Sequence, residues 1–114
     1  MKQRDVLWAS FPYSNTGENK HRPVLVLSND AYNQRGEDVL VCAITSNLQP
    51  KPHTLPLEQK DLEEGTLPLK SRVRCDKLFT IEKNLLGNRM GRMAGETFNL
   101  VVKEVIKLIG SATR

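Results

Sequence analysis

The chain has 114 residues, and its 17 lysines and arginines against 13 acidic residues give a formal net charge of +4 at pH 7. This length suits a single domain over residues 1–114, with one hydrophobic core. Hydrophobic residues make up 39% of the chain and charged residues 26%, which excludes an intrinsically disordered protein. The small positive excess leaves open both an anionic partner and a mildly basic protein that binds no polyanion.

Apolar runs, cysteines and histidines exclude several further classes of protein. No apolar run reaches the roughly 18 residues of a membrane span, and the first residues lack the pattern of a signal peptide. Cys42 and Cys75 lie in β-like runs, where free, buried thiols suit a reducing cytoplasm better than a disulfide framework. The two cysteines and two histidines lack the spacing of zinc ligands. We therefore expect a cytoplasmic protein with no metal, no other cofactor and no membrane contact.

The first half of the chain predicts three strands. A mostly apolar run at residues 6–11 predicts the first, and the polar, turn-rich residues 13–21 predict a loop. Residues 24–28 and 39–45 are apolar at consecutive positions, as in central strands that are covered on both faces. One helical turn is expected in the connection between them, after Asp30.

The second half predicts shorter strands and one helix. Prolines allow only brief strands such as residues 53–55, and residues 61–64 predict one helical turn that a glycine ends. Alternation at residues 71–76 predicts a strand, and residues 79–81 predict another. The apolar spacing over residues 98–109 predicts an amphipathic C-terminal helix. Several short strands followed by one helix predict a small curled sheet or barrel.

Three charged side chains alternate along one predicted strand. Since positions i and i+2 of a strand share a face, we expect Arg72, Arg74 and Asp76 to project together, while Val73 and Cys75 enter the core. A neighbouring guanidinium and carboxylate most often form a surface ion pair of little energetic value. With a phosphate between them, the carboxylate can take a proton from a ribose 2′-hydroxyl while the guanidinium stabilises charge at phosphorus. The strand alone favours the plain ion pair.

The polar loop before the first central strand is a second candidate site, since it holds Glu18, His21 and Arg22. Loops on a rigid scaffold often carry binding residues, and Pro23 holds the preceding arginine in extended geometry. The simpler alternative is a solvated turn.

Hydroxyl and amide side chains follow one another where the strand at residues 39–45 ends. Thr45, Ser46 and Asn47 can bind phosphate oxygens, but the same residue types commonly cap turns. Their position favours the cap.

Four motifs occur in the order and spacing of one known family. They are WASFP at 8–12, GE at 17–18 with HRPVLVLS at 21–28, AITSN at 43–47, and VRCDKLFTIEK at 73–83, followed by LG at 86–87. In these motifs the sequence resembles the MazF/PemK (Kid) toxins of type II toxin–antitoxin systems. The resemblance covers nearly the whole chain.

This resemblance implies a mainly β (α+β) fold, a small SH3-like antiparallel β-barrel with a C-terminal α-helix, assembled as a homodimer. It also implies a metal-independent endoribonuclease that cleaves single-stranded RNA at short sequences and leaves 2′,3′-cyclic phosphate and 5′-hydroxyl ends. Such cleavage of mRNA inhibits translation and growth. A cognate antitoxin of the MazE/PemI type, usually with an acidic disordered tail, is expected to block the RNA groove and to link the toxin indirectly to DNA.

The catalytic residues of the family carry over onto this sequence as two sets. In the MazF-type branch they are the arginine of the Arg-Pro motif and the threonine that ends the later strand, which correspond to Arg22 and Thr45. In the Kid/PemK-type branch they are the arginine and aspartate of the Val-Arg-Cys-Asp strand, which correspond to Arg74 and Asp76. The sequence holds both sets and does not rank them.

Residues beside these two sets are expected to bind RNA. They are Glu18, Lys20, His21, Ser46, Asn47, Arg72 and Lys77. The loop before Arg22 is shorter than is usual in the family, and Lys77 stands where glutamine is common. The added positive charge suits RNA, or else adjusts the contact with the antitoxin. Together the cations predict a local basic groove.

Two alternatives remain beside the ribonuclease. A non-catalytic inhibitor of DNA gyrase on the same barrel, like CcdB, relies on a C-terminal Trp-Gly-Ile ending, whereas this sequence ends in Ser-Ala-Thr-Arg and has its only tryptophan at Trp8. An inactive family member that binds RNA or antitoxin without cleavage is the other alternative, although every candidate catalytic residue is present.

Overall fold

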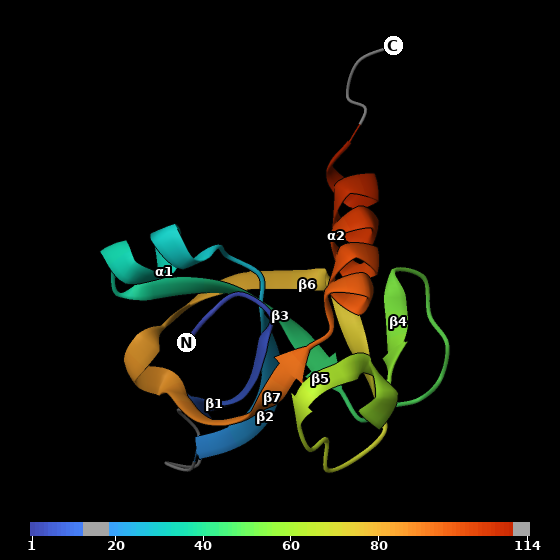
Figure 1. The fold of residues 1–114 in the computed structure, drawn as a ribbon, viewed down its shortest axis with the longest axis horizontal. Coiled ribbons are helices and arrows are strands. Elements are labelled where there is room, and N and C mark those ends of the chain that lie inside the picture. Colours follow the sequence, from blue (N-terminus) through green and yellow to red (C-terminus); the bar gives the residue numbers. More distant parts are fainter. Residues whose placement is uncertain (13–18, 111–114) are drawn as a thin grey trace.

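One curled antiparallel sheet forms most of the computed structural model, which describes residues 1–12 and 19–110 (Figure 1). Within these residues the strands are β1 (Asp5–Pro12), β2 (Asn19–Val26), β3 (Asp38–Thr45), β4 (Thr54–Leu57), β5 (Leu62–Gly65), β6 (Ser71–Glu82) and β7 (Leu86–Met93). They lie in the order β4-β6-β3-β2-β1-β7-β5, and neighbouring strands run antiparallel. The helices are α1 (Asp30–Arg35) and α2 (Gly95–Ile109), with 3-10 turns at Gln59–Asp61 and Lys83–Leu85. The predicted small antiparallel barrel with a C-terminal helix is confirmed, and Figure 1 shows α2 rising from one end of it.

The first half of the chain folds as predicted, with one difference in β2. The apolar runs form β1, β2 and β3, and the expected helical turn is α1. However, β2 begins before its apolar run, because Lys20 and His21 pair with Phe11 and Ser10 of β1. The prediction that Lys20, His21 and Arg22 lie in a loop is therefore wrong, since Arg22 also belongs to β2 and pairs with Ala9. Residues 13–18 of the predicted loop lie outside the described residues.

The helical turn predicted at residues 61–64 is wrong, because residues 62–65 form β5 and pair with β7. Gly65 has a φ of +87°, in the left-handed region that favours glycine. A Cβ atom on Gly65 would lie 2.1 Å from the carbonyl oxygen of Met90. The partner strand comes from later in the chain, so a tertiary contact overrides the local helical pattern here.

The sequence does not predict β7, whose residues do not alternate regularly between polar and apolar. It pairs with β1, although the two strands lie near opposite ends of the sequence. Asp5 of β1 is only 2% exposed, and its Oδ1 accepts hydrogen bonds from Arg89 Nε at 3.0 Å and Arg92 Nε at 3.4 Å. A buried carboxylate requires such partners, so these two arginines allow β1 to lie in the interior of the sheet, between β2 and β7.

The strands predicted at residues 71–76 and 79–81 are one strand, β6, with a break in its pairing. Ala43 of β3 pairs with Arg74, whereas the adjacent Cys42 pairs with Leu78. The residues of β6 between these pairs form a bulge. Within it, Cys75 is buried, and its N–H donates to a carbonyl of the β3–β4 connection at 3.0 Å. Bulges bend a strand and redirect its side chains.

Buried side chains form two clusters, and successive strand residues alternate between them, so the clusters lie on opposite faces of the sheet. The inner cluster includes Cys42, Cys75, and Phe98 and Val101 of α2. The outer cluster consists of Leu7, Ala9, Val24, Val26, Val39, Val41 and Ile81. Both cysteines are free and buried, as predicted. Burial raises the pKa of both thiols, that of Cys75 to about 11.

Replacing Gly65 with alanine is expected to destabilise the fold, because a Cβ atom would meet the Met90 carbonyl at a positive φ. We expect the free energy of unfolding to fall by at least about 1–3 kcal/mol. The matched control is Gly36→Ala, since a Cβ there has no atom within 4 Å and φ is −130°. Urea denaturation of the control should show equal stability or a gain of up to about 1 kcal/mol. Equal stability of the two variants would contradict the close approach of β5 and β7.

Candidate functional site

Candidate side chains from three neighbouring strands project from one face of the sheet. Ala43 of β3 pairs on one side with Arg74 of β6, and on the other with the β2 residue two positions after Arg22. Directly paired residues share a face of the sheet, and so do residues two positions apart in one strand. Arg22, Thr45, Arg72 and Arg74 therefore lie on the same face, which continues the outer cluster toward one end of the barrel.

Arg74 and Asp76 form a two-point ion pair at the bulge of β6. Arg74 donates from Nε to Oδ1 of Asp76 at 3.1 Å and from Nη2 to Oδ2 at 2.8 Å. These hydrogen bonds lower the pKa of Asp76 and raise that of Arg74, while burial acts weakly in the opposite direction. The side chains are 35% and 32% exposed, so a ligand from solvent can reach both partners. The predicted projection of this pair on one face is confirmed.

Arg72 is held by the neighbouring edge strand. Its Nε donates to Oγ1 of Thr54 at 3.0 Å, and its Nη2 donates to the carbonyl of Thr54 at 3.1 Å. Arg72 and Arg74 line a small cavity of about 110 Å³ together with Thr45 and Asn47. The structure thus brings Thr45, from one predicted catalytic set, to the arginine of the other.

The polar residues at the end of β3 cap a turn, as the sequence favoured. Oγ1 of Thr45 accepts a hydrogen bond from the Asn47 N–H at 3.1 Å, and Oδ1 of Asn47 accepts one from the Gln49 N–H at 3.0 Å. The Thr45 hydroxyl keeps its own proton as a donor. The cap therefore holds this hydroxyl in place without using its capacity to donate to a phosphate oxygen.

Arg22 and Lys77 line a larger cavity of about 540 Å³, whose other walls include Phe11, Ala43 and Phe79. The two phenylalanine rings meet edge to face with centroids 5.8 Å apart. Ala43 separates this cavity from Arg74, with which it pairs. Arg22 and its predicted catalytic partner Thr45 therefore share a face but line different cavities.

The remaining predicted RNA-binding residues are distributed around these cavities. His21 and Ser46 are exposed and line a third cavity of about 220 Å³ at one end of the barrel, which Arg22 also reaches. Lys20 is exposed on β2. Glu18 lies outside the described residues.

The sequence did not predict a contact between the β3–β4 connection and α2 that lies next to the bulge of β6. Nδ1 of His53 lies 3.1 Å from Oε1 of Glu104 on α2, and the His53 carbonyl is the acceptor for the Cys75 N–H. His53 also has a φ of +63°, which is uncommon for a residue other than glycine. Its charge contributes to the lowered pKa of Asp76. No local pattern marks an interaction between residues so far apart in the chain.

The chemistry of this face follows from its side chains. Guanidinium groups bind phosphate oxygens through paired hydrogen bonds, and an ionised carboxylate beside them can accept a proton. Among the described residues, no group of three or more histidine, cysteine, aspartate or glutamate side chains is arranged to hold a metal ion. No helix in the same part of the chain is long and apolar enough to cross a membrane.

The small curled barrel with one C-terminal helix carries a face of arginines around a carboxylate, whose guanidinium groups suit an anionic ligand. Residues 2–109 match the family model of PemK-like, MazF-like toxins of type II toxin–antitoxin systems. The chain belongs to this family. No curated protein sequence gave a significant match.

Solved structures with the same fold cover nearly the whole chain. A mycobacterial endoribonuclease in complex with its cognate antitoxin is 22% identical, with a TM-score of 0.79 and coverage of 100% of this chain and 99% of that one. The MazE–MazF complex of Deinococcus radiodurans (Form-III) is 19% identical, with a TM-score of 0.83 and 98% coverage of both chains. The toxin MazF-mt6 of Mycobacterium tuberculosis is 23% identical, with a TM-score of 0.74 and coverage of 93% and 96%. This chain thus has the MazF fold.

Replacing Arg74 with glutamine is expected to raise the pKa of Asp76 toward the ordinary value for an aspartate, because the guanidinium hydrogen bonds hold it low. Arg72→Gln is the matched control, since that guanidinium is bonded to Thr54 and not to a carboxylate. NMR titration of the Asp76 side-chain carboxyl carbon measures both variants. An unchanged Asp76 pKa in Arg74→Gln would contradict the ion pair.

Proposed function

We propose that the chain is an endoribonuclease toxin that cleaves single-stranded RNA, including mRNA, without a metal ion. The observation that carries this proposal is the exposed, two-point ion pair of Arg74 and Asp76. A phosphate at this position meets a cation that binds it, and the 2′-hydroxyl beside that phosphate meets a carboxylate that accepts a proton. Family membership supports the same activity, as do similar mycobacterial structures described as endoribonucleases.

The proposed reaction needs no reagent beyond RNA. Asp76 takes the proton of the ribose 2′-hydroxyl, the 2′-oxygen bonds to the adjacent phosphorus, and the bond from phosphorus to the 5′-oxygen breaks. The leaving oxygen takes a proton from solvent water and Asp76 returns its proton to solvent, so the products are a 2′,3′-cyclic phosphate and a 5′-hydroxyl. Arg74 and Arg22 stabilise the negative charge at phosphorus, since arginine has too high a pKa to be an efficient acid. Thr45 donates to a phosphate oxygen.

Binding of RNA also prepares the carboxylate. In the free protein the Arg74 hydrogen bonds lower the pKa of Asp76, which makes Asp76 a weak base. A phosphate that takes over these hydrogen bonds releases the carboxylate, and its basicity rises when the 2′-hydroxyl is in place. The remaining proposed RNA contacts are Lys20, His21, Ser46, Asn47, Arg72 and Lys77, together with Glu18, which lies outside the described residues.

The proposed protein partner is a cognate antitoxin of the MazE/PemI type, whose acidic tail competes with RNA for the same arginines. Two similar structures contain such a pair, in the mycobacterial and Deinococcus radiodurans proteins. Through this antitoxin the toxin is carried to DNA. The site of action is the cytoplasm, where mRNA is the substrate and where buried thiols such as Cys42 and Cys75 stay reduced.

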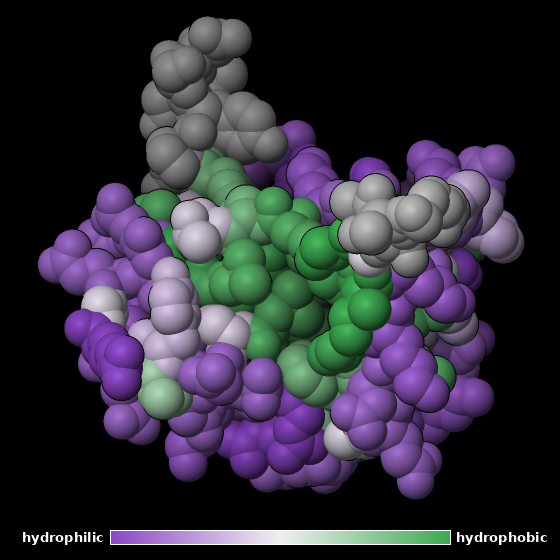
Figure 2. Space-filling view, turned by 90° about the horizontal axis from the view of Figure 1, so that it is seen from above, coloured by the Kyte–Doolittle hydropathy of each residue, from purple (hydrophilic) through white to green (hydrophobic). Residues whose placement is uncertain are grey.

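We expect two copies of the chain to associate through α2. Val102 packs against the inner cluster, and Ile106 and Ile109 continue its stripe on the helix into solvent with exposures of 59% and 72%. Figure 2 shows apolar residues gathered in a hollow at the centre of one face and ringed by hydrophilic residues. Apolar area of this kind marks interaction surfaces, and a second copy presents the same area in return.

The central prediction is that the purified protein cleaves single-stranded RNA in excess EDTA and leaves 5′-hydroxyl ends. Asp76→Asn is expected to lower the rate about 10²- to 10⁴-fold, the usual range for loss of a general base. Asp38→Asn is the control, because Asp38 is exposed and pairs with Glu82 at the other end of β6. End-labelled fragments measure the rates.

Two results of this assay would change the proposal. If Asp76→Asn stays active while Arg22→Ala does not, the catalytic set is Arg22 and Thr45. If no RNA in a broad pool is cleaved, the chain binds RNA or antitoxin without catalysis.

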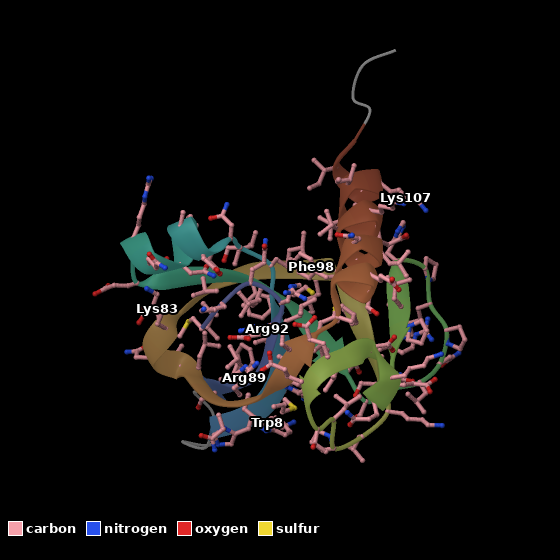
Figure 3. The ribbon with its side chains drawn as sticks, viewed as in Figure 1. Trp8, Lys83, Arg89, Arg92, Phe98 and Lys107 are labelled. Atoms are coloured by element: carbon pink, nitrogen blue, oxygen red, sulfur yellow. The ribbon has the colours of Figure 1, made fainter. Side chains whose placement is uncertain are left out.

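Lys77→Ala is expected to weaken RNA binding in a salt-dependent way, because Lys77 is exposed beside Arg22 in the larger cavity. Each lost phosphate contact reduces the slope of log K against log salt by about 0.7 for single strands. Lys83→Ala is the control, since Figure 3 shows Lys83 on the far side of the barrel from α2. Fluorescence anisotropy at several salt concentrations measures both slopes. Equal slopes in the two variants would show that Lys77 makes no phosphate contact with the RNA.

Ile106→Glu is expected to convert a dimer into a monomer, because it places a charge in the apolar stripe. Leu48→Glu makes the same kind of change at a leucine that is 52% exposed and belongs to the β3–β4 connection, and should leave the mass unchanged. Size-exclusion chromatography with light scattering measures both. A monomeric wild-type protein would contradict association through this helix.

A further inference from the structure

The interior of the barrel is apolar near α2 and becomes partly polar at the opposite end. Figure 3 shows Trp8 at the lower end of the barrel and Phe98 at the base of α2. Along the inner face of β1, buried Val6 is followed two residues later by the half-buried Trp8. On the neighbouring strands the inner face continues in the same way. The buried residue is followed on that face by Pro23 and His21 after Leu25 on β2, by Ser46 after Ile44 on β3, and by Ser71 after Val73 on β6. The apolar core thus opens into a mouth with one aromatic wall and a polar rim.

This mouth is the third cavity described above, which we call the barrel-end cavity. Its volume is about 220 Å³, and its apolar walls include Trp8, Pro23, Leu69 and Met90. This is below the roughly 300 Å³ at which pockets for whole small-molecule ligands begin. The space therefore suits one flat ring system and not a complete nucleotide.

The rim of the barrel-end cavity carries groups that recognise ring edges and phosphates. His21 and Ser46 reach the cavity from the ends of β2 and β3, and imidazole and hydroxyl groups both donate and accept hydrogen bonds. Arg22 lines this cavity and the larger cavity beside it. A base held here would therefore have the phosphate of its nucleotide next to Arg22.

Trp8 is the residue that gives the cavity its selectivity for flat rings. A tryptophan that served only the core would be buried, whereas Trp8 is half-buried and lines open space. A Cβ atom on Gly87 would lie 3.9 Å from the Trp8 Cβ, so the main chain of β7 passes close to Trp8. Unpaired bases stack on aromatic side chains in this way when proteins bind single strands.

We propose that the barrel-end cavity binds one unpaired base of the RNA, which stacks on Trp8 with its edge toward His21 and Ser46 and its phosphate at Arg22. This inference rests on the proposed function, because it takes single-stranded RNA as the ligand. It adds a binding site for the base next to the phosphate contacts, and it assigns the choice of base to Trp8, His21 and Ser46.

The test uses Trp8 as its own reporter, since it is the only tryptophan of the chain. The full-length protein is titrated with short RNA in which every ribose is 2′-O-methylated, so that the nucleophile is blocked and no cleavage occurs. Oligomers of uridine, cytidine and adenosine are compared with an abasic oligomer of equal length and charge. We expect the base-containing oligomers to quench Trp8 fluorescence, with unequal affinity among bases, and the abasic oligomer to bind without quenching.

Two variants separate stacking from general loss of structure. Trp8→Leu is expected to weaken binding of the best oligomer about 5- to 150-fold, the range found for loss of one stacked base, with no change for the abasic oligomer. Leu69→Ala removes a wall residue that is 64% exposed, so it should fold normally and weaken the same oligomer several-fold. Leu48→Ala is its matched control and should bind like the wild type.

The outcomes distinguish this inference from the proposed function. Anisotropy that reports RNA binding while Trp8 fluorescence stays constant would overturn the base site and leave the ribonuclease proposal standing. Quenching of equal size by the abasic oligomer, or full affinity in Leu69→Ala, would also overturn the base site. If no oligomer binds and unmodified RNA is not cleaved, both proposals fail together.

Discussion

The candidate site depends on how the bulge of β6 is fixed at Cys75. The thiol is buried in the inner cluster, and the backbone N–H is bonded to the His53 carbonyl. With one residue held on both sides, its neighbours Arg74 and Asp76 can only project outward, where they pair with each other. His53 in turn contacts Glu104 of α2. The helix, the β3–β4 connection and the bulge therefore form one support for the ion pair.

This support explains how an exposed ion pair can have a defined geometry. Surface pairs of long side chains are usually worth little, because ordering them costs entropy. Here Arg72 is held by Thr54 and Thr45 is held by its turn, so the side chains around Arg74 are already ordered. A ligand phosphate then exchanges one set of hydrogen bonds for another and does not have to organise the groove.

Much of the sheet and part of the site could be predicted from the sequence, for reasons that depend on particular residues. The consecutive apolar residues of β2 and β3 and the alternation around Val73 carry their own structural signal. Neither β5 nor β7 does, because their pairing depends on the close approach of Gly65 and Gly91, and the contact between His53 and Glu104 joins residues far apart. The sequence also could not place Thr45 and Arg74 around one cavity, since that arrangement arises from the register between β3 and β6.

The pairing of β1 with β7 has a consequence for the timing of folding. Asp5 is among the first residues made, yet the side chains that neutralise it, Arg89 and Arg92, leave the ribosome near the end of synthesis. Until then β1 lacks one of its two neighbours and carries a charge that cannot be buried. β1, an interior strand of the sheet, thus gains its second neighbour late, and the groove on β2, β3 and β6 gains its final support only when nearly the whole chain has emerged. If the chain cleaves RNA as proposed, this delay keeps the nascent protein from cleaving the message that encodes it.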